Sequence, residues 1–282
     1  LVAGWRLAVL AAVGFFVIGA FGLWTASLET LALILFAVTV TLVIGTFMEL
    51  FGHFDLETAW TTRHWSGTFT DPVFLRSVKN TIALGLSAAL VGTLVYALIS
   101  YLIVRTQLPG RGLIDGLSWL PWGLPGVLIS LALLWTVLGS GDAVKLLYGT
   151  VSLLVLAIII KEMPLGTQII KAAVQQISPE LEEASNAAGA DRLDYFQRIL
   201  LPLLKPTMLS VAIIVFISAA RDIPTVVFLS THESRTLSLL MLDYIAEANQ
   251  EKAAVLGVFL IFVIFGFLLI GKLLGFRRPV VS

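Results

Sequence analysis

Two short stretches come close to the residue types and spacing that a chemical site requires. The stretch "GFLLIGKL" begins at Gly266 and matches a phosphate-binding G-x-x-x-x-G-K-[ST] loop, except that Leu273 replaces the hydroxyl that would hold Mg²⁺. The stretch "HESRT" begins at His232 and matches half of the zinc-protease pattern H-E-x-x-H, but Thr236 replaces the second histidine. Neither stretch therefore predicts a nucleotide or zinc site.

Other ligand and nucleophile types are few. The chain has no cysteine, which excludes disulfides, thiolate catalysis and thiolate metal ligands, and its three histidines are not paired at a ligand spacing. Hard and borderline ligands do gather in one stretch, at His53, Asp55, Glu57, His64 and Asp71, but with the irregular spacing of a solvated loop. We expect no metal site, no cofactor bound by this chain and no enzymatic activity.

One apolar stretch contains helix-breaking residues, which are compatible with a route for a transported substrate. The stretch "WLPWGLPG" contains Trp119, Pro121, Trp122 and Pro125. Each proline removes a backbone hydrogen bond that lipid cannot replace, so the break must face protein or a water-filled cavity. Two interpretations stay open, a proline kink with interfacial tryptophans or a helix discontinuity that lines a substrate route.

A charged pair interrupts a second apolar stretch. Arg221 and Asp222 lie deep within it and Pro224 follows them. A charge at that depth is costly unless it faces protein or water. The pair therefore marks an early helix end near the external interface, or it lines a translocation path.

The third candidate is a water-soluble segment, "ELEEASNAAGADRLDYFQRILLP", residues 180–202. Ser178 can cap a helix and Pro179 suits its first position. Acidic residues in the first turns suit the positive end of a helix. They are Glu180, Glu182 and Glu183.

The same segment predicts a helix, a sharp turn and a second helix. The first helix should run to about Ala188, Gly189 should supply a left-handed residue, and Asp191 can cap the second helix. The apolar face of the first helix is thin, so packing on its own protein would gain little. We interpret the segment as a docking element for a partner.

Composition places these candidates in a membrane protein. Of 282 residues, 58% are hydrophobic and 13% are charged. Windows of about 20 residues can cross roughly 30 Å of hydrocarbon. The candidates are Leu7–Leu28, Thr30–Met48, Asn80–Val104, Gly116–Gly141, Leu146–Ile160, Pro206–Leu229 and Ala253–Gly271. We predict an all-α, polytopic transmembrane bundle of about six or seven spans. Net charge is zero, so nucleic acid is not an expected partner.

Basic residues set the expected orientation, because they accumulate on the cytoplasmic side. Alternate connections carry most of them, at Arg105, Arg111, Lys161, Lys171, Arg192, Arg198, Lys205, Lys272, Arg277 and Arg278. We expect N-terminal transmembrane helices (1–50), an external loop (51–72), a core (73–275) with a cytoplasmic loop at 171–205, and a cytoplasmic tail (276–282). The start at Leu1 suggests a piece of a longer chain, and the side of the N-terminus stays open.

The soluble segment resembles a known family. The residues Glu183-Ala184-Ser185, Gly189, Ile199 and Leu201-Pro202 resemble the E-A-A-x3-G-x9-I-x-L-P loop of ABC importer permeases, with Ser185 replacing the second alanine. In that family this loop is the coupling helix, which docks in a groove of the ATPase subunit. The resemblance assigns coupling to Glu182, Glu183, Ala184, Ser185, Gly189, Ile199, Leu201 and Pro202. It implies a polar ATPase contact at Glu183 and anchoring at the last three.

Further stretches resemble the ferric iron branch of that family, whose permeases are often two fused halves. They are "LPGRGLIDGLSWLPWGLPG", "ISPELEEASNAAGA" and "AAVLGV". The resemblance implies a type I, MetI-like fold in the bacterial inner membrane and transport of ferric iron, with thiamine, polyamine, sulfate or phosphonate as alternatives. Implied partners are two ATPase subunits that carry ATP and Mg²⁺, a second permease half or copy, an external binding protein and the lipid bilayer.

A rival interpretation is an ATPase-independent channel or secondary transporter. The sequence shows neither an internal repeat nor an intramembrane series of carboxylates, which such a protein would favour.

Overall fold

The computed structural model describes residues 29, 37–56 and 58–275. Some predicted features lie outside the described residues. They are the span Leu7–Leu28, residues 30–36 of the span Thr30–Met48, Glu57 and the tail at 276–282. The described residues are helical and contain no β-strand, only a β-bridge between Met48 and Trp60. The prediction of an all-α chain is confirmed.

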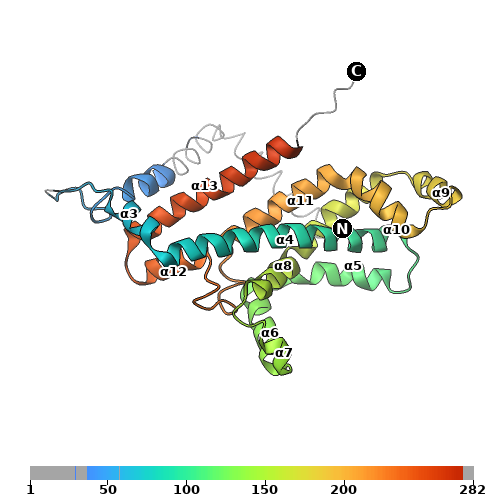
Figure 1. Ribbon diagram of the computed structural model, residues 1–282, viewed down its shortest axis with the longest axis horizontal. Helices are drawn as coiled ribbons and strands as arrows, with labels where there is room; N and C mark the ends of the chain where they lie inside the picture. Colours follow the sequence, from blue (N-terminus) through green and yellow to red (C-terminus); the bar gives the residue numbers. More distant parts are fainter. Residues whose placement is uncertain (1–28, 30–36, 57, 276–282) are drawn as a thin grey trace, which may run out of the picture.

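Four helical stretches of the described residues are long and apolar enough to cross a membrane. They cover 72–105, 151–176, 193–221 and 250–273. The elements that form them are α4 (Pro72–Arg105), α8 (Val151–Gln176), α11 (Leu201–Arg221) and α13 (Gln250–Gly275). Figure 1 shows α4, α11 and α13 running side by side along the long axis of the molecule.

The predicted span Gly116–Gly141 is broken at its prolines. The chain forms α5 (Arg111–Trp119), a 3₁₀ turn η1 (Leu120–Gly123) and α6 (Gly126–Gly139), and the axis bends by 112° between η1 and α6. Proline causes the break, because Pro121 and Pro125 lack the N–H groups that a continuous helix would use. The second half, with α7 (Asp142–Lys145), projects from the bundle in Figure 1.

Two other predicted boundaries move. The expected span Leu146–Ile160 is replaced by α8, which passes through Lys161 and ends at Gln176, so Lys161 lies within the helix and not on a cytoplasmic connection. The expected span Pro206–Leu229 ends early, because Asp222 has extended backbone angles and terminates α11. The charged pair at 221–222 therefore marks a helix end.

Two short helices cover one end of the bundle, opposite α9 (Glu180–Ala187) in Figure 1. They are α3 (Arg63–Thr70), inside the predicted loop 51–72, and α12 (Leu237–Ala246). The Tyr244 hydroxyl donates to Asp71 Oδ2 at 3.1 Å. Burial, and then the Asp71 carboxylate, raise the pKa of Tyr244 to about 12, so this tyrosine stays a hydrogen-bond donor at neutral pH.

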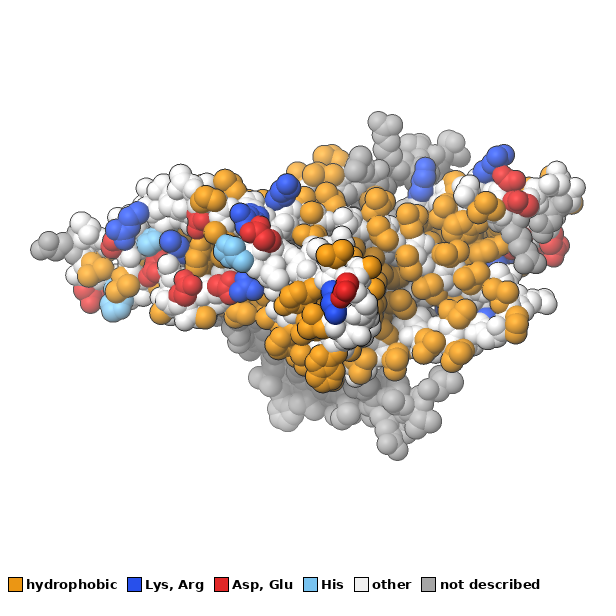
Figure 2. All heavy atoms as spheres, turned by 60° about the horizontal axis from the view of Figure 1, so that its bottom comes forward, with side chains coloured by type: hydrophobic (Ala, Val, Ile, Leu, Met, Phe, Trp, Pro, Cys, Tyr) orange, Lys and Arg blue, Asp and Glu red, His pale blue; other side chains and the backbone are white. Residues whose placement is uncertain are grey.

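The core lies where α4 packs against α8 and α11. Leu84, Tyr96, Leu154, Ile158 and Val215 are buried there. Figure 2 shows that charged side chains gather mostly toward the ends of the molecule, while the surface between them is mainly hydrophobic. This distribution suits a helix bundle that lipid surrounds, because the apolar belt needs no water.

Candidate functional site

The soluble segment folds as predicted at its first helix. The Ser178 hydroxyl accepts a hydrogen bond from the Glu180 amide at 3.3 Å, and α9 then runs to Ala187. Gly189 has φ +86°, and the Ala190 amide donates to the Ser185 carbonyl at 3.1 Å. These are the left-handed residue and the closing bond of a Schellman motif. The turn predicted at Gly189 is confirmed.

The second helix of the segment begins as predicted but does not end as a separate element. The Asp191 side chain accepts from the Asp194 amide at 2.7 Å and caps α10 (Arg192–Tyr195). A π-helical turn, η2 (Phe196–Leu200), follows and leads directly into α11. We call residues 178–202 the loop element. Its second half is the beginning of a membrane-length helix.

The separated motif positions come together in the loop element. Ser185, Gly189 and Ile199 line one recess of about 310 Å³. Its other lining residues are Ala188, Ala190, Asp194 and Arg198. Of the remaining motif positions, Glu183, Ala184 and Pro202 are exposed, while Glu182 and Leu201 are half-buried.

Residues outside the motif attach the loop element to the bundle. Tyr195 and Leu200 are fully buried. The Tyr101 ring on α4 lies 6.5 Å from the Tyr195 ring and 5.2 Å from the Phe196 ring, between centroids. The motif comparison missed these anchors, whose only sequence signal is aromatic or apolar type between motif positions. Of the three anchors expected from the motif, Ile199 and Leu201 are half-buried and pack against the core, whereas Pro202 is exposed.

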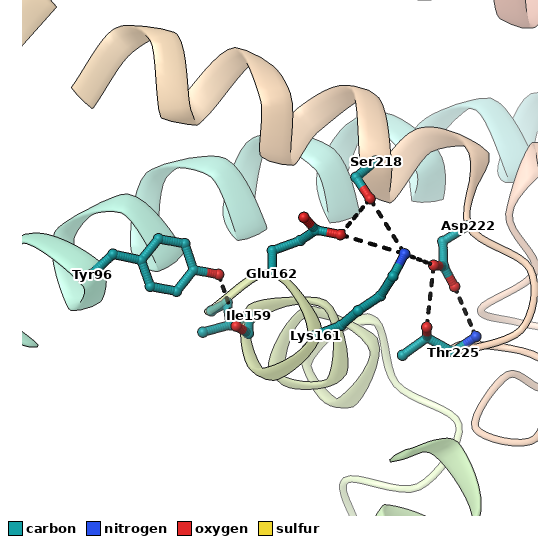
Figure 3. A network of polar contacts seen from close by, with 7 residues as sticks. All are labelled: Tyr96, Ile159, Lys161, Glu162, Ser218, Asp222 and Thr225. Carbon is teal, nitrogen blue, oxygen red and sulfur yellow. Dashed lines mark hydrogen bonds and ion pairs between the residues drawn. The ribbon is translucent and has the colours of Figure 1, made fainter. Parts of the chain in front are cut away.

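A charged network lies between α8 and α11, and Figure 3 shows its side chains. Lys161 Nζ lies 2.5 Å from Asp222 Oδ2 and 3.4 Å from Glu162 Oε1. The Ser218 hydroxyl donates to Glu162 Oε1 at 2.6 Å. Charges within membrane-length helices are tolerated when they are paired in this way. Sequence reasoning missed Lys161 and Glu162, although a Lys-Glu pair within an apolar run is itself a signal.

Asp222 also organises the turn that follows α11. Its carboxylate accepts from the Thr225 amide at 2.8 Å and from the Thr225 hydroxyl at 3.2 Å, and its carbonyl accepts from the Ser238 hydroxyl at 2.7 Å. Irregular backbone at membrane depth must satisfy its polar groups within the protein. Asp222 does so for this turn.

The break between α5 and α6 meets the same turn. A Cβ on Gly126 would lie 2.6 Å from the Thr225 hydroxyl and 3.4 Å from its amide nitrogen, so only glycine fits this contact. The structure thus brings the predicted residues Pro125 and Asp222 to one place. We call Gly126, Lys161, Glu162, Ser218, Asp222 and Thr225 the helix junction.

The other predicted path residues stay outside this junction. Trp119 and Trp122 are 44% and 64% exposed, with ring centroids 5.3 Å apart, and Pro121 is half-buried. Arg221 is exposed and makes no ion pair within the part of the chain that the structure describes. These residues face away from the chain's own core.

No metal centre forms among the described residues, where no three His, Asp or Glu side chains lie together as ligands. Asp71 instead accepts from the Val73 amide and from Tyr244. His64 lies buried in α3.

The sequence matches one family model. Residues 107–278 match the binding-protein-dependent transport system inner membrane component. This stretch is more than half of the 282 residues.

Individual relatives are more distant. The chain is 25% identical, over 94% of its length, to the ferric transport system permease protein FbpB of Actinobacillus pleuropneumoniae, of which it covers 36%. It is also 25% identical, over 62% of its length, to the sulfate transport system permease protein CysT of Salmonella typhimurium, of which it covers 65%. The chain thus spans about a third of the ferric relative and about two thirds of the sulfate relative.

The fold matches solved structures. A chain of a bacterial alginate ABC transporter, in complex with an alginate pentasaccharide-bound periplasmic protein, superposes with a TM-score of 0.72 at 20% identity, covering 90% of this chain and 94% of that one. This similarity shows a shared permease fold. Taken with the family match, it means that this chain belongs to the binding-protein-dependent transport system inner membrane components.

Proposed function

We propose that the chain is the membrane-spanning permease subunit, or half of one, of an ATP-driven importer in the bacterial inner membrane. The observation that supports this most is the loop element. Three separated motif positions, Ser185, Gly189 and Ile199, form one recess beside an exposed helix. The second half of the element continues into α11.

The geometry of the loop element suits docking better than chemistry. Glu180 and Glu183 are exposed on α9, and Leu181 is 44% exposed. The helix therefore presents both charged and apolar side chains to its surroundings. A groove on an ATPase subunit would cover that surface. ATP and Mg²⁺ would be bound there, on two such subunits, and not on this chain.

Continuity of the helix gives the loop element a way to act on the membrane. Because α10, η2 and α11 form one helical stretch from Leu193 to Arg221, a displacement of α9 and its turn tilts α11. Arg105, at the end of α4, holds the end of α8 that leads into the loop element. It donates hydrogen bonds to the carbonyls of Val174, at 3.0 Å, and Ile177. ATP-driven closure would reach the bundle along this route.

The break between α5 and α6 is the part of the proposed translocation path that the chain itself carries. Trp119, Trp122 and Arg221 are exposed on this single chain, where a second permease half or copy would face them. Pro121 and Pro125 create the break, and Asp222 holds the adjoining turn. An external binding protein would deliver substrate to this path.

A pair of matched glycines tests coupling. Gly189 and Gly110 have φ +86° and +91°, and neither would bring a Cβ within 4 Å of another group. Gly110 precedes α5 and lies outside the loop element. In a complex reconstituted with its ATPase, Gly189→Asp should abolish ATPase association and transport, whereas Gly110→Asp should leave both. Equal behaviour of the two variants would contradict the coupling role.

Ferric iron is the substrate we propose. Its support is the FbpB relative, which aligns with 94% of the chain, whereas the CysT relative aligns with 62%. The test is accumulation of radioactive iron, sulfate, thiamine, a polyamine or a phosphonate in proteoliposomes with the complete system. Accumulation of any of these in place of iron would refute the iron assignment.

One observation favours the rival, an ATPase-independent transporter. Glu162 lies within a membrane-length helix and Asp222 lies at the end of another, and such carboxylates are the kind of group that ion-coupled carriers use. Both already pair with Lys161, which leaves them less suited to carrying an ion. Transport by the purified chain in liposomes without an ATPase would decide for the rival.

A further inference from the structure

The charged network of the helix junction joins the two helices that flank the loop element. Lys161 and Glu162 belong to α8, which enters the loop element, while Ser218 belongs to α11, the helix that leaves it, and Asp222 directly follows the end of α11. Figure 3 shows the four side chains meeting between α8 and α11. All four residues lie outside the loop element and its motif.

Removing one member of the network is costly because its charges are largely shielded from water. The Asp222 side chain is 1% exposed and that of Glu162 is 12% exposed, while Lys161 is 30% exposed. Two carboxylates share one ammonium, so removing Lys161 would leave two poorly hydrated negative charges close together. A buried pair broken on one side is far more costly than a surface pair.

The network gives α8 and α11 a second connection, in addition to the loop element. At one end the chain itself connects the two helices through the loop element. Toward the other end, Lys161 and Asp222 tie them across 61 residues of sequence. A pair of helices tied at both ends moves as one body, whereas a pair tied at one end only is free to splay.

The tie also extends to the broken helix. The Asp222 carboxylate that pairs with Lys161 also accepts hydrogen bonds from the amide and the hydroxyl of Thr225. Thr225 in turn lies against Gly126 at the start of α6. A movement of the α8 and α11 pair is therefore passed to the start of α6 through the Asp222 carboxylate, while an ion pair between Lys171 and Asp115 at 2.6 Å joins α8 to α5.

We propose that Lys161 and Asp222 are positioning residues which lock α8, α11 and the turn after α11 into one lever. The lever carries displacement of the loop element to the break at Pro125 and Gly126. This inference rests on the proposed importer function, because it names the part that transmits the ATPase movement.

The test compares transport with ATP hydrolysis in the complete complex in proteoliposomes. Lys161→Met and Asp222→Asn should hydrolyse ATP while transport per ATP falls about tenfold, the usual size of a coupling between sites. Asn keeps an acceptor for the Thr225 amide, so it removes the charge with the least damage to the turn. Lys161→Arg should retain most of the coupling.

A matched surface pair provides the control. Lys145 and Asp142 form an ion pair at 3.1 Å, and their side chains are 47% and 100% exposed. Lys145→Met should leave transport per ATP unchanged. If Asp222→Asn and Lys145→Met gave the same ratio as the native complex, or if Lys161→Arg were as uncoupled as Lys161→Met, the lever would be wrong.

A distance measurement separates this inference from the importer function. The chain has no cysteine, so cysteines at Leu156 on α8 and Ile214 on α11, both exposed, take spin labels specifically. In the full chain in lipid nanodiscs, without any ATPase, the label distance should be narrow and should broaden in Asp222→Asn. An unchanged distribution refutes the lever, whereas failure of the importer function appears only as transport that needs no ATPase.

Discussion

The loop element and the helix junction lie along the same two helices, yet they are built in opposite ways. The loop element takes its cap, turn and recess from residues 178–202, all close in sequence. The helix junction combines Gly126 with residues 161–162 and 218–225, joined by contacts that span 61 residues of sequence between Lys161 and Asp222 and 99 between Gly126 and Thr225. One is exposed and local, and the other is buried and assembled by packing.

This difference teaches where sequence patterns are informative. A docking surface must present its residues in a fixed local geometry to a partner, so spacing alone identifies it. A charged residue inside the bundle is stable when neighbouring side chains in space pair with it. A prediction from hydropathy ends the helix at such a residue, because the prediction assumes that the side chain faces lipid. Lys161 shows this error directly.

The largest effect should come from removing the carboxylate at the centre of the junction. Asp222→Ala leaves the Lys161 ammonium and the Thr225 amide without this partner, and should lower the free energy of unfolding by about 3 kcal/mol. Asp142→Ala, at a fully exposed carboxylate, should leave it essentially unchanged. Denaturation in mixed detergent micelles measures both. Equal values would erase the distinction between buried and exposed charge.

A smaller effect should come from the contact between the break and the turn. Gly126→Ala forces a Cβ against Thr225 and should destabilise the protein by about 2 kcal/mol, as overpacking usually does. Gly139→Ala, at the other end of α6 and facing open space, should be nearly neutral. Thermal unfolding in the same micelles compares them. A neutral Gly126→Ala would mean that the break and the turn do not need this close approach.

Loss of one buried hydrogen bond should be smaller again. The Tyr96 hydroxyl donates to the Ile159 carbonyl at 2.8 Å and links α4 to α8 beside the junction. Tyr96→Phe should lower the free energy of unfolding by about 1 kcal/mol. Tyr148→Phe, at a tyrosine that is 40% exposed, is the control. A loss as large as that of Asp222→Ala would show that α4 contributes more to the junction than its single bond suggests.

The smallest effect should appear in the exposed region, and in binding rather than stability. Glu183→Gln should weaken association with the ATPase by about two- to fivefold, the range of an exposed ion pair, and the effect should shrink as salt is raised. Asp55→Asn, exposed at the opposite end, should leave association unchanged. Calorimetry or surface plasmon resonance measures the affinity. A change in folding stability at Glu183 would contradict its assignment to a partner contact.

Much of the fold follows from local pattern. The apolar runs predicted α13 and the C-terminal end of α4 closely, although α4 begins at Pro72 and not at Asn80, and Ser178, Gly189 and Asp191 predicted the caps and turn of the loop element. Anchoring followed from the motif only in part: Ile199 and Leu201 pack against the core as expected, but Tyr195 and Leu200, which lie outside the motif, are fully buried. The assignments of coupling and path residues remain predictions that the experiments above test.

The sequence by itself determined that the chain is a helical membrane protein with one water-soluble segment that forms a helix and a glycine turn, since composition, caps and spacing act within a few residues of each other. Only the tertiary structure decided that α8 continues through Lys161, that the helix with two prolines bends by 112°, and that Asp222 joins them. The physical reason is that a buried charge or a broken backbone is stable only when a distant part of the chain supplies its partner.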